Sequence, residues 1–168
     1  DENNKIVVKS VERDPITFTL KGSGTEESPY IINNYQQWKE ATTKVKQDVY
    51  FKLNTDIDFS GKPYYAFGTA GNYLVATLDG GYHKIYNIVI NGTNYAGISG
   101  YNNGGTIKGL NVENIKVNSQ NNYIGGIVGY NASGNVIGIN IDGEVNGNTV
   151  IGGAVGALTV GTVNEVNV

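Results

Sequence analysis

The sequence contains no cysteine and no methionine, and it has three prolines and a single histidine, His83. The absence of cysteine excludes disulfides and thiolate metal sites. A zinc protease needs two histidines on one helix face, in the pattern H-E-x-x-H, so that activity is excluded for this segment. A Ser-His-Asp triad would have to use His83, but no G-x-S-x-G motif accompanies it. We therefore interpret His83 as a turn residue.

Basic residues are also scarce, since 12 Lys and Arg face 15 Asp and Glu and the net charge is -3. Without a basic cluster the chain has no electrostatic footprint for a phosphate backbone, so nucleic acid is not expected as a partner. No apolar run approaches the roughly 20 residues that span a bilayer. The start DENNKIVV does not resemble a signal peptide, and we expect no membrane insertion.

Glycine is abundant, with 24 residues, although the usual share is only about 7%. The glycines follow no three-residue period and proline is rare, which excludes collagen. We therefore expect glycine at turns and at close approaches of the backbone. A hydrophobic content of 39% in 168 residues supports a single domain with one core.

An internal repeat is the main signal in the sequence. The blocks GISGYN, GIVGYN and GAVGAL begin at Gly97, Gly126 and Gly153, so their spacing is nearly constant. A second block follows each one at residues 105–112, 134–141 and 161–168. The matched blocks form three apolar columns: Ile107/Val136/Val163, Leu110/Ile139/Val166 and Val112/Ile141/Val168. An asparagine column, Asn111/Asn140/Asn167, lies between the last two.

These columns predict successive coils of one stack, because side chains of a strand alternate between its two faces. The expected fold is all-β, a right-handed parallel β-helix (β-solenoid) of about five coils. Leu110, Val112, Ile139 and Ile141 should point into the core, and Asn111 and Asn140 should point outward. Two earlier segments extend the pattern, because residues 49–59 are interpreted as one strand and residues 84–90 superpose on residues 106–112. A Gly-rich antiparallel sandwich is the alternative, but it does not explain the columns.

A short capping α-helix is predicted near residues 35–46. Asn34 is the expected N-cap with Gln37 at the third helical position, and Trp38, Ala41 and Val45 share one face. Repeat proteins need such caps to cover the end of the core. We divide the chain into an N-terminal linker or edge strand, residues 1–21, and the solenoid, residues 22–168. Because Val168 stands on a column position without a following cap, we expect the natural protein to continue.

The repeated Gly-x-x-Gly blocks at Gly97, Gly126 and Gly153 resemble the GLUG repeat of bacterial surface proteins. Upstream segments at residues 24–32, 51–58 and 77–85 resemble those that precede such repeats, so the resemblance covers about residues 22 to 168. It implies a β-helical region of an adhesin or cell-wall protein, or an accessory region of a secreted immunoglobulin A1 metalloprotease. The third copy departs from the pattern, because Ala157-Leu158 replace the Tyr-Asn pair, which questions a continuous functional surface.

Three carboxylates are candidates for chemistry. Asp56 and Asp58 share a strand face and Asp79 is expected on the next coil, where a glycosidase or lyase would need paired carboxylates. We favour solvated side chains or acceptors of turn amides. Neither an EF-hand loop nor a G-G-x-G-x-D nonapeptide supports calcium. The expectation is no catalytic residue, no metal site and no cofactor.

Tyrosines and asparagines recur between neighbouring coils and form the candidate binding surface. An aromatic column beside asparagines could stack on sugar rings, whereas the alternative is that the tyrosines stack on one another and cover the core edge. The candidate residues are Tyr95, Tyr101, Asn102, Tyr123, Tyr130 and Asn131.

The sequence thus predicts a non-enzymatic extracellular module, located on a bacterial cell surface or secreted, that acts as a stalk or as a host-binding region. Its ligand would be a host glycan or protein, and neighbouring domains of the same longer chain are expected. The alternatives are a fragment of a β-helical carbohydrate-active enzyme and a segment of a phage tail fibre. Carboxylates clustered in a cleft would favour the enzyme, and an intertwined trimer would favour the fibre.

Overall fold

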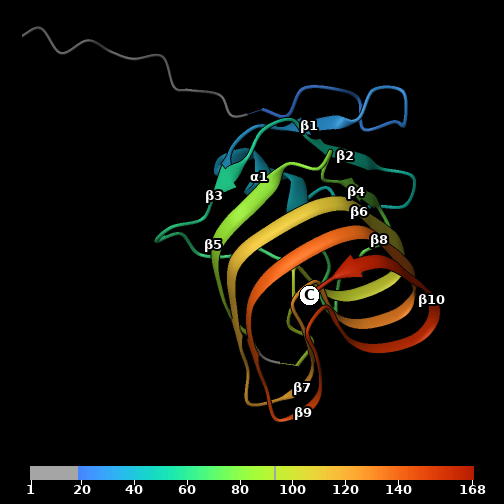
Figure 1. Cartoon of the computed structure of the whole chain (residues 1–168). Coiled ribbons are helices and arrows are strands. Elements are labelled where there is room, and N and C mark those ends of the chain that lie inside the picture. Colours follow the sequence, from blue (N-terminus) through green and yellow to red (C-terminus); the bar gives the residue numbers. More distant parts are fainter. Residues whose placement is uncertain (1–18, 93) are drawn as a thin grey trace, which may run out of the picture.

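The chain folds as a parallel β-solenoid of about four turns. The computed structural model describes residues 19–92 and 94–168. Figure 1 shows curved strands stacked one above another, with β1 and α1 at one end and β10 at the other. The elements are β1 (Tyr30–Ile32), α1 (Tyr35–Thr42), β2 (Tyr50–Leu53), β3 (Ile57–Asp58), β4 (Thr77–Asp79), β5 (Lys84–Asn91), β6 (Ser99–Asn118), β7 (Asn122–Gly125), β8 (Val128–Asn146), β9 (Thr149–Gly152) and β10 (Val155–Asn167).

The strands pair in parallel from each coil to the next. Strand β6 is long enough to bend around the coil, so β4 pairs with its middle and β5 with its C-terminal part. Strand β8 pairs with β6 and β10 pairs with β8, while β7 and β9 form a separate two-stranded sheet. The predicted all-β solenoid is confirmed, because only this stacking brings each repeat beside the preceding one.

The predicted register of the repeats is also confirmed. Leu110 lies opposite Ile139, and Val112 lies opposite Ile141. All four side chains are buried, whereas Asn140 is exposed and Asn111 is half-buried. The third repeat continues the register, since Val166 lies opposite Ile139.

The predicted superposition of residues 84–90 on residues 106–112 is wrong. Lys84 lies opposite Asn111 and Ile85 lies opposite Val112, so β5 pairs further along β6 than predicted. The error has a physical cause, because one apolar spacing occurs twice along β6. The first set of residues with this spacing, Ile107, Leu110 and Val112, matches the predicted register. The second set, Val112, Ile115 and Val117, matches the observed pairing.

Residues 49–59 do not form one strand, because the chain turns a corner after β2 and begins β3 at Ile57. The first turn is also incomplete. Strand β1 pairs with β2, but the chain then enters α1 instead of continuing along the sheet. This is why the stack has about four turns rather than the five expected.

The predicted helix forms with the predicted cap. The side chain of Asn34 accepts a hydrogen bond of 2.9 Å from the Gln37 amide, and the Gln37 side chain in turn accepts one from the amide of Asn33. The helix ends at Thr42, earlier than expected, although Val45 is still buried. Trp38 lies edge-on to Phe59 and Phe67, and all three rings are buried, so the helix contributes its largest side chain to the core.

The coils turn at residues with positive φ that recur in register. One such corner is formed by Gly109 and Gly138, with φ of 57° and 64°. In the last coil Glu165 occupies the corresponding position with φ of 54°. Glycine adopts this conformation without steric cost, whereas a side chain such as that of Glu165 is strained there.

The boundary predicted at residue 21 falls close to the start of the described residues. Lys21 makes an isolated antiparallel bridge with Ile31. Residues 1–18, the main part of the predicted linker or edge strand, lie outside the described ranges. The boundary itself therefore stays a prediction.

Candidate functional site

The candidate binding tyrosines form one aromatic ladder along the stack. Tyr101 and Tyr130 have ring centroids 5.0 Å apart, and Tyr95 and Tyr123 are stacked at 5.2 Å with an angle of 8° between their planes. The two columns interlock, since the rings of Tyr123 and Tyr130 are 5.1 Å apart. Tyr73 extends the ladder by packing on Tyr101 at 4.5 Å. We define the tyrosine ladder as these five residues.

The rings of the ladder mainly contact one another, as the alternative interpretation expected. Except for Tyr73, which is 42% exposed, the rings are half-buried. Burial raises the pKa of Tyr101 above its ordinary value, and the neighbouring tyrosines act in the same direction. The rings of the ladder therefore cover one another in part.

Asn102 and Asn131 do not lie beside the ladder at the surface, contrary to the prediction. Both side chains are completely buried. Asn102 bonds the backbone of Gly105 on both its amide and its carbonyl, and Asn131 donates to the carbonyl of Gly134. Each lies at a corner of its coil, where a buried asparagine can satisfy the backbone of the tight turn. They are inaccessible to a ligand.

A row of asparagines runs along the outer face, as the column predicted. Asn140 donates to the side-chain oxygen of Asn111 at 2.8 Å, and Asn167 donates to that of Asn140 at 3.2 Å. Asn111 donates in turn to the carbonyl of Tyr82. Each bond runs from a later coil to the preceding one. We call these three asparagine side chains the asparagine ladder.

Two further asparagine rows follow the same direction. One runs from Asn146 through Asn118 to Asn91, and the other leads from Asn114 to Asn87. The second row ends on a carboxylate, because Asn87 donates to Asp58 at 2.9 Å. Side-chain bonds between coils are therefore a repeated feature of this surface.

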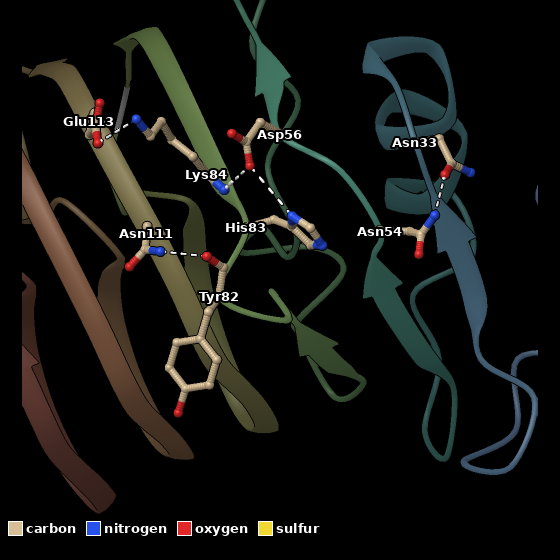
Figure 2. Close-up of polar contacts among 8 residues, drawn as sticks. All are labelled: Asn33, Asn54, Asp56, Tyr82, His83, Lys84, Asn111 and Glu113. Atoms are coloured by element: carbon tan, nitrogen blue, oxygen red, sulfur yellow. Dashed lines mark hydrogen bonds and ion pairs between the residues drawn. The ribbon is translucent and has the colours of Figure 1, made fainter.

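Figure 2 shows the polar contacts around His83. The Asp56 carboxylate lies 3.5 Å from Nδ1 of His83 and accepts a hydrogen bond of 2.9 Å from the amide of Lys84. The Lys84 ammonium binds Glu113 at 2.7 Å, and this hydrogen bond raises the pKa of Lys84. The amide of His83 donates to the carbonyl of Gly80, so His83 closes a turn, as interpreted from the sequence.

The other two carboxylates are also held by turn donors. Asp58 accepts from the amide and the hydroxyl of Ser60 as well as from Asn87. The bond from Asn87, followed by those from Ser60, lowers the pKa of Asp58 to about 2. Asp79 accepts from the amide of Gly81 at 2.8 Å and lies 3.4 Å from the Lys108 ammonium. The expectation that carboxylates bind turn amides is confirmed for Asp58 and Asp79, whereas Asp56 accepts from the amide of Lys84, the first residue of β5.

Tyr82 is an exposed aromatic residue that was not among the predicted binding residues. Its ring is 68% exposed and its φ is 59°. In Figure 2 the ring points away from Asp56, His83 and Lys84. From the sequence, only its neighbour His83 was interpreted, as a turn residue. The sequence signal that could have identified this exposed ring is an aromatic residue directly after two glycines. Glycines have no side chain, so they leave a neighbouring ring uncovered.

Neither a metal cluster nor a membrane helix is found in the described ranges. Residues 19–92 and 94–168 hold no group of three or more His, Asp or Glu side chains that could bind a metal ion. In the same ranges the only helix, α1, is too short to cross a membrane.

Comparisons with known proteins give a sequence relative and a similar structure. Halomucin of Haloquadratum walsbyi is 31% identical over 159 residues, which cover 86% of this chain but 2% of halomucin. The chain therefore spans a very small part of that protein. The crystal structure of a candidate immunoglobulin A1 protease from Bacteroides ovatus has 16% identity and a TM-score of 0.47, covering 89% of this chain and 77% of the other. No family model matches the sequence.

Proposed function

We propose that this chain is a non-enzymatic, extracellular stalk segment. The observation that carries the proposal is the set of side-chain ladders that run along the stack. The asparagine and tyrosine ladders join each coil to the one before it, in addition to the parallel backbone pairing. Stacked repeats derive their stability from contacts between neighbours, and ladders strengthen those contacts along the direction in which a stalk carries load.

The similarity to halomucin supports an extracellular location, because the name of that protein describes a mucin and mucins act outside cells. A place on a bacterial cell surface, like the resemblance to GLUG repeats, stays a prediction. Antibodies against residues 19–168 should label intact cells of the source organism as strongly as permeabilised cells. Labelling confined to permeabilised cells would contradict the location.

Force spectroscopy tests the stalk. The chain, held between two reference domains, should unfold at a higher force than a variant that combines Asn111→Ala and Asn140→Ala, because this variant loses the ladder bonds. Asn164→Ala is the matched control, since Asn164 is an exposed asparagine of β10 outside these rows. Equal unfolding forces for the chain and the double variant would argue against load-bearing ladders.

The non-enzymatic part of the proposal is supported by the carboxylates, because Asp56, Asp58 and Asp79 each accept a backbone amide hydrogen bond. A glycosidase requires carboxyl groups placed for acid, base or nucleophile roles. Incubation with plant, bacterial and host glycans should yield no products. Turnover that disappears in Asp56→Asn or Asp79→Asn would establish a carbohydrate-active enzyme instead.

A second candidate function is binding of a host glycan or protein at the tyrosine ladder. The exposed ring of Tyr73, at the end of the ladder, favours it. Loss of ligand binding in a Tyr73→Ala variant would support this candidate.

A further inference from the structure

The exposed ring of Tyr82 differs from every ring of the tyrosine ladder. Each ladder ring has at least one other ring within 6.0 Å. Tyr82 has no ring contact of this kind among the described residues, and it is 68% exposed where Tyr73 is 42% exposed. One aromatic surface on this molecule is therefore free to accept a planar or ring-shaped ligand.

The backbone of Tyr82 is held firmly despite the exposure of its side chain. Its amide donates to the carbonyl of Gly109 at 2.6 Å, and its carbonyl accepts from the Asn111 side chain at 2.5 Å. The residue also occupies the left-handed region with φ of 59°. A backbone that is already ordered loses less conformational entropy when a ligand binds, which favours binding.

Two glycines of successive coils form the floor beneath the ring. A side chain on Gly109 would begin 3.7 Å from Cε2 of Tyr82, and one on Gly138 would begin 3.5 Å from the tyrosine hydroxyl. The ring thus lies along the glycine row. Because glycine has no side chain, no side chain at these two positions covers the ring.

An ion pair borders the same glycine. The Asp79 carboxylate is also 3.7 Å from the point where a Gly109 side chain would begin, and its other oxygen lies 3.4 Å from the Lys108 ammonium. Both side chains are partly exposed, at 30% and 46%. They also line a cavity of about 360 Å³, together with Lys52, Glu26 and Glu27. The Tyr82 ring, the ion pair of Asp79 and Lys108, and the cavity therefore lie next to one another on the surface.

We propose that Tyr82, Asp79 and Lys108 form a binding site for a neutral oligosaccharide. One sugar ring stacks its apolar C–H face on Tyr82, while Asp79 accepts from and Lys108 donates to sugar hydroxyls. The next sugar unit enters the cavity. The ligand is neutral rather than acidic, because the cavity is lined by three carboxylates, Glu26, Glu27 and Asp79, and by two ammonium groups, Lys52 and Lys108, so an acidic sugar gains no net attraction. This inference does not depend on the stalk proposal.

Titration calorimetry tests the site with five defined probes: maltohexaose, cellohexaose, laminarihexaose, mannohexaose and chitohexaose. The chain should bind at least one of them. With that probe, Tyr82→Ala should weaken binding about tenfold or more, as for a central aromatic contact. Tyr82→Phe should stay within about twofold, because it keeps the stacking surface. Asp79→Asn should also weaken binding, because the ion pair with Lys108 is lost.

Tyr86→Ala is the matched control, because Tyr86 is a half-buried tyrosine of β5 outside the tyrosine ladder and outside the proposed site, and it should bind as the unchanged chain does. Melting temperatures of all variants verify that each is folded. The inference is overturned if none of the probes binds, if a folded Tyr82→Ala variant binds normally, or if Tyr73→Ala alone abolishes binding. Each of these results leaves the force measurement untouched, so failure of the site and failure of the stalk are distinguishable.

Discussion

The two ends of the stack solve the problem of core closure differently. At the α1 end, Trp38, Phe51, Phe59 and Phe67 pack edge to face with centroids 4.7 to 5.4 Å apart, and each is at most 1% exposed. In the last coil the apolar side chains of β10 are aliphatic, and three of them are open to solvent. Leu158 is 49% exposed, Val160 is 64% exposed and Val163 is 39% exposed.

The comparison shows that the repeat alone does not bury its own core. Val136 is fully buried because Val163 covers it, whereas Val163 has no following coil above it among the described residues. Small strand side chains are buried only when a neighbouring coil or a cap covers them. At the α1 end this cover comes from large aromatic residues, one of which, Phe51, continues the column of Ile107 through Leu78.

The largest effect is expected at the capped end. Trp38→Ala should lower the free energy of unfolding by about 3–5 kcal/mol, because it removes the ring that joins Phe59 to Phe67 and leaves a cavity. It also removes the hydrogen bond from the indole to the carbonyl of Tyr65. Urea denaturation measures the loss. Gln36→Ala, an exposed position of the same helix, should change stability by less than about 0.5 kcal/mol.

A pair of substitutions in one column sharpens the comparison between a covered coil and the last one. Ile139→Ala should cost about 2–5 kcal/mol, because Ile139 is fully buried between Leu110 and Val166. Val166→Ala should cost about 1 kcal/mol, since that side chain is only half-buried. Asn140→Ser, on the outer face, should cost much less than Ile139→Ala. Equal costs for Ile139→Ala and Val166→Ala in urea would mean that coil position does not matter.

The last coil also contains a strained corner that can be relieved. Val150 has φ of 53°, in register with Tyr123, and a β-branched residue is rarely found there. Val150→Gly should raise the free energy of unfolding by up to about 1 kcal/mol, because the strain of about 1–2 kcal/mol exceeds the entropic cost of glycine. Thermal unfolding measures the change. Val160→Gly, an exposed valine with ordinary φ in the same coil, should instead lower stability.

The smallest effect concerns the pH dependence of the capped half. The pKa of Asp58 is lowered to about 2 in the folded chain, below its ordinary value of 3.8. Its contribution to stability is therefore present above about pH 4 and is lost as the pH falls through about 2. Asp58→Asn should make the urea midpoint less dependent on pH in this window. Asp142→Asn, at an exposed carboxylate of β8, is the control. An unchanged pH profile in Asp58→Asn would show that the bonds from Asn87 and Ser60 do not persist in solution.

The parts of the fold that could be predicted are those in which spacing and chemistry agree. The columns of Leu110 and Asn111 followed from the alternation of side chains and from repeats of similar length. The register of Ile85 did not, because the spacing of its apolar neighbours fits two positions along β6 and only the closed coil selects one. The candidate binding tyrosines were placed on the correct columns, but their rings pack on one another.

By itself, the sequence determined the all-β solenoid, the pairing of the last three repeats and the helix with its Asn34 cap, because these depend on periodicity and on local hydrogen bonds. The tertiary structure alone decided that Asn102 and Asn131 point inward, since a corner between strands sets the face of each following residue. It also decided that Tyr82 stands free, with Asp79 and Lys108 beside it. Residues from different coils meet at one glycine there, and no spacing along the chain reveals which side chains a neighbouring coil leaves uncovered.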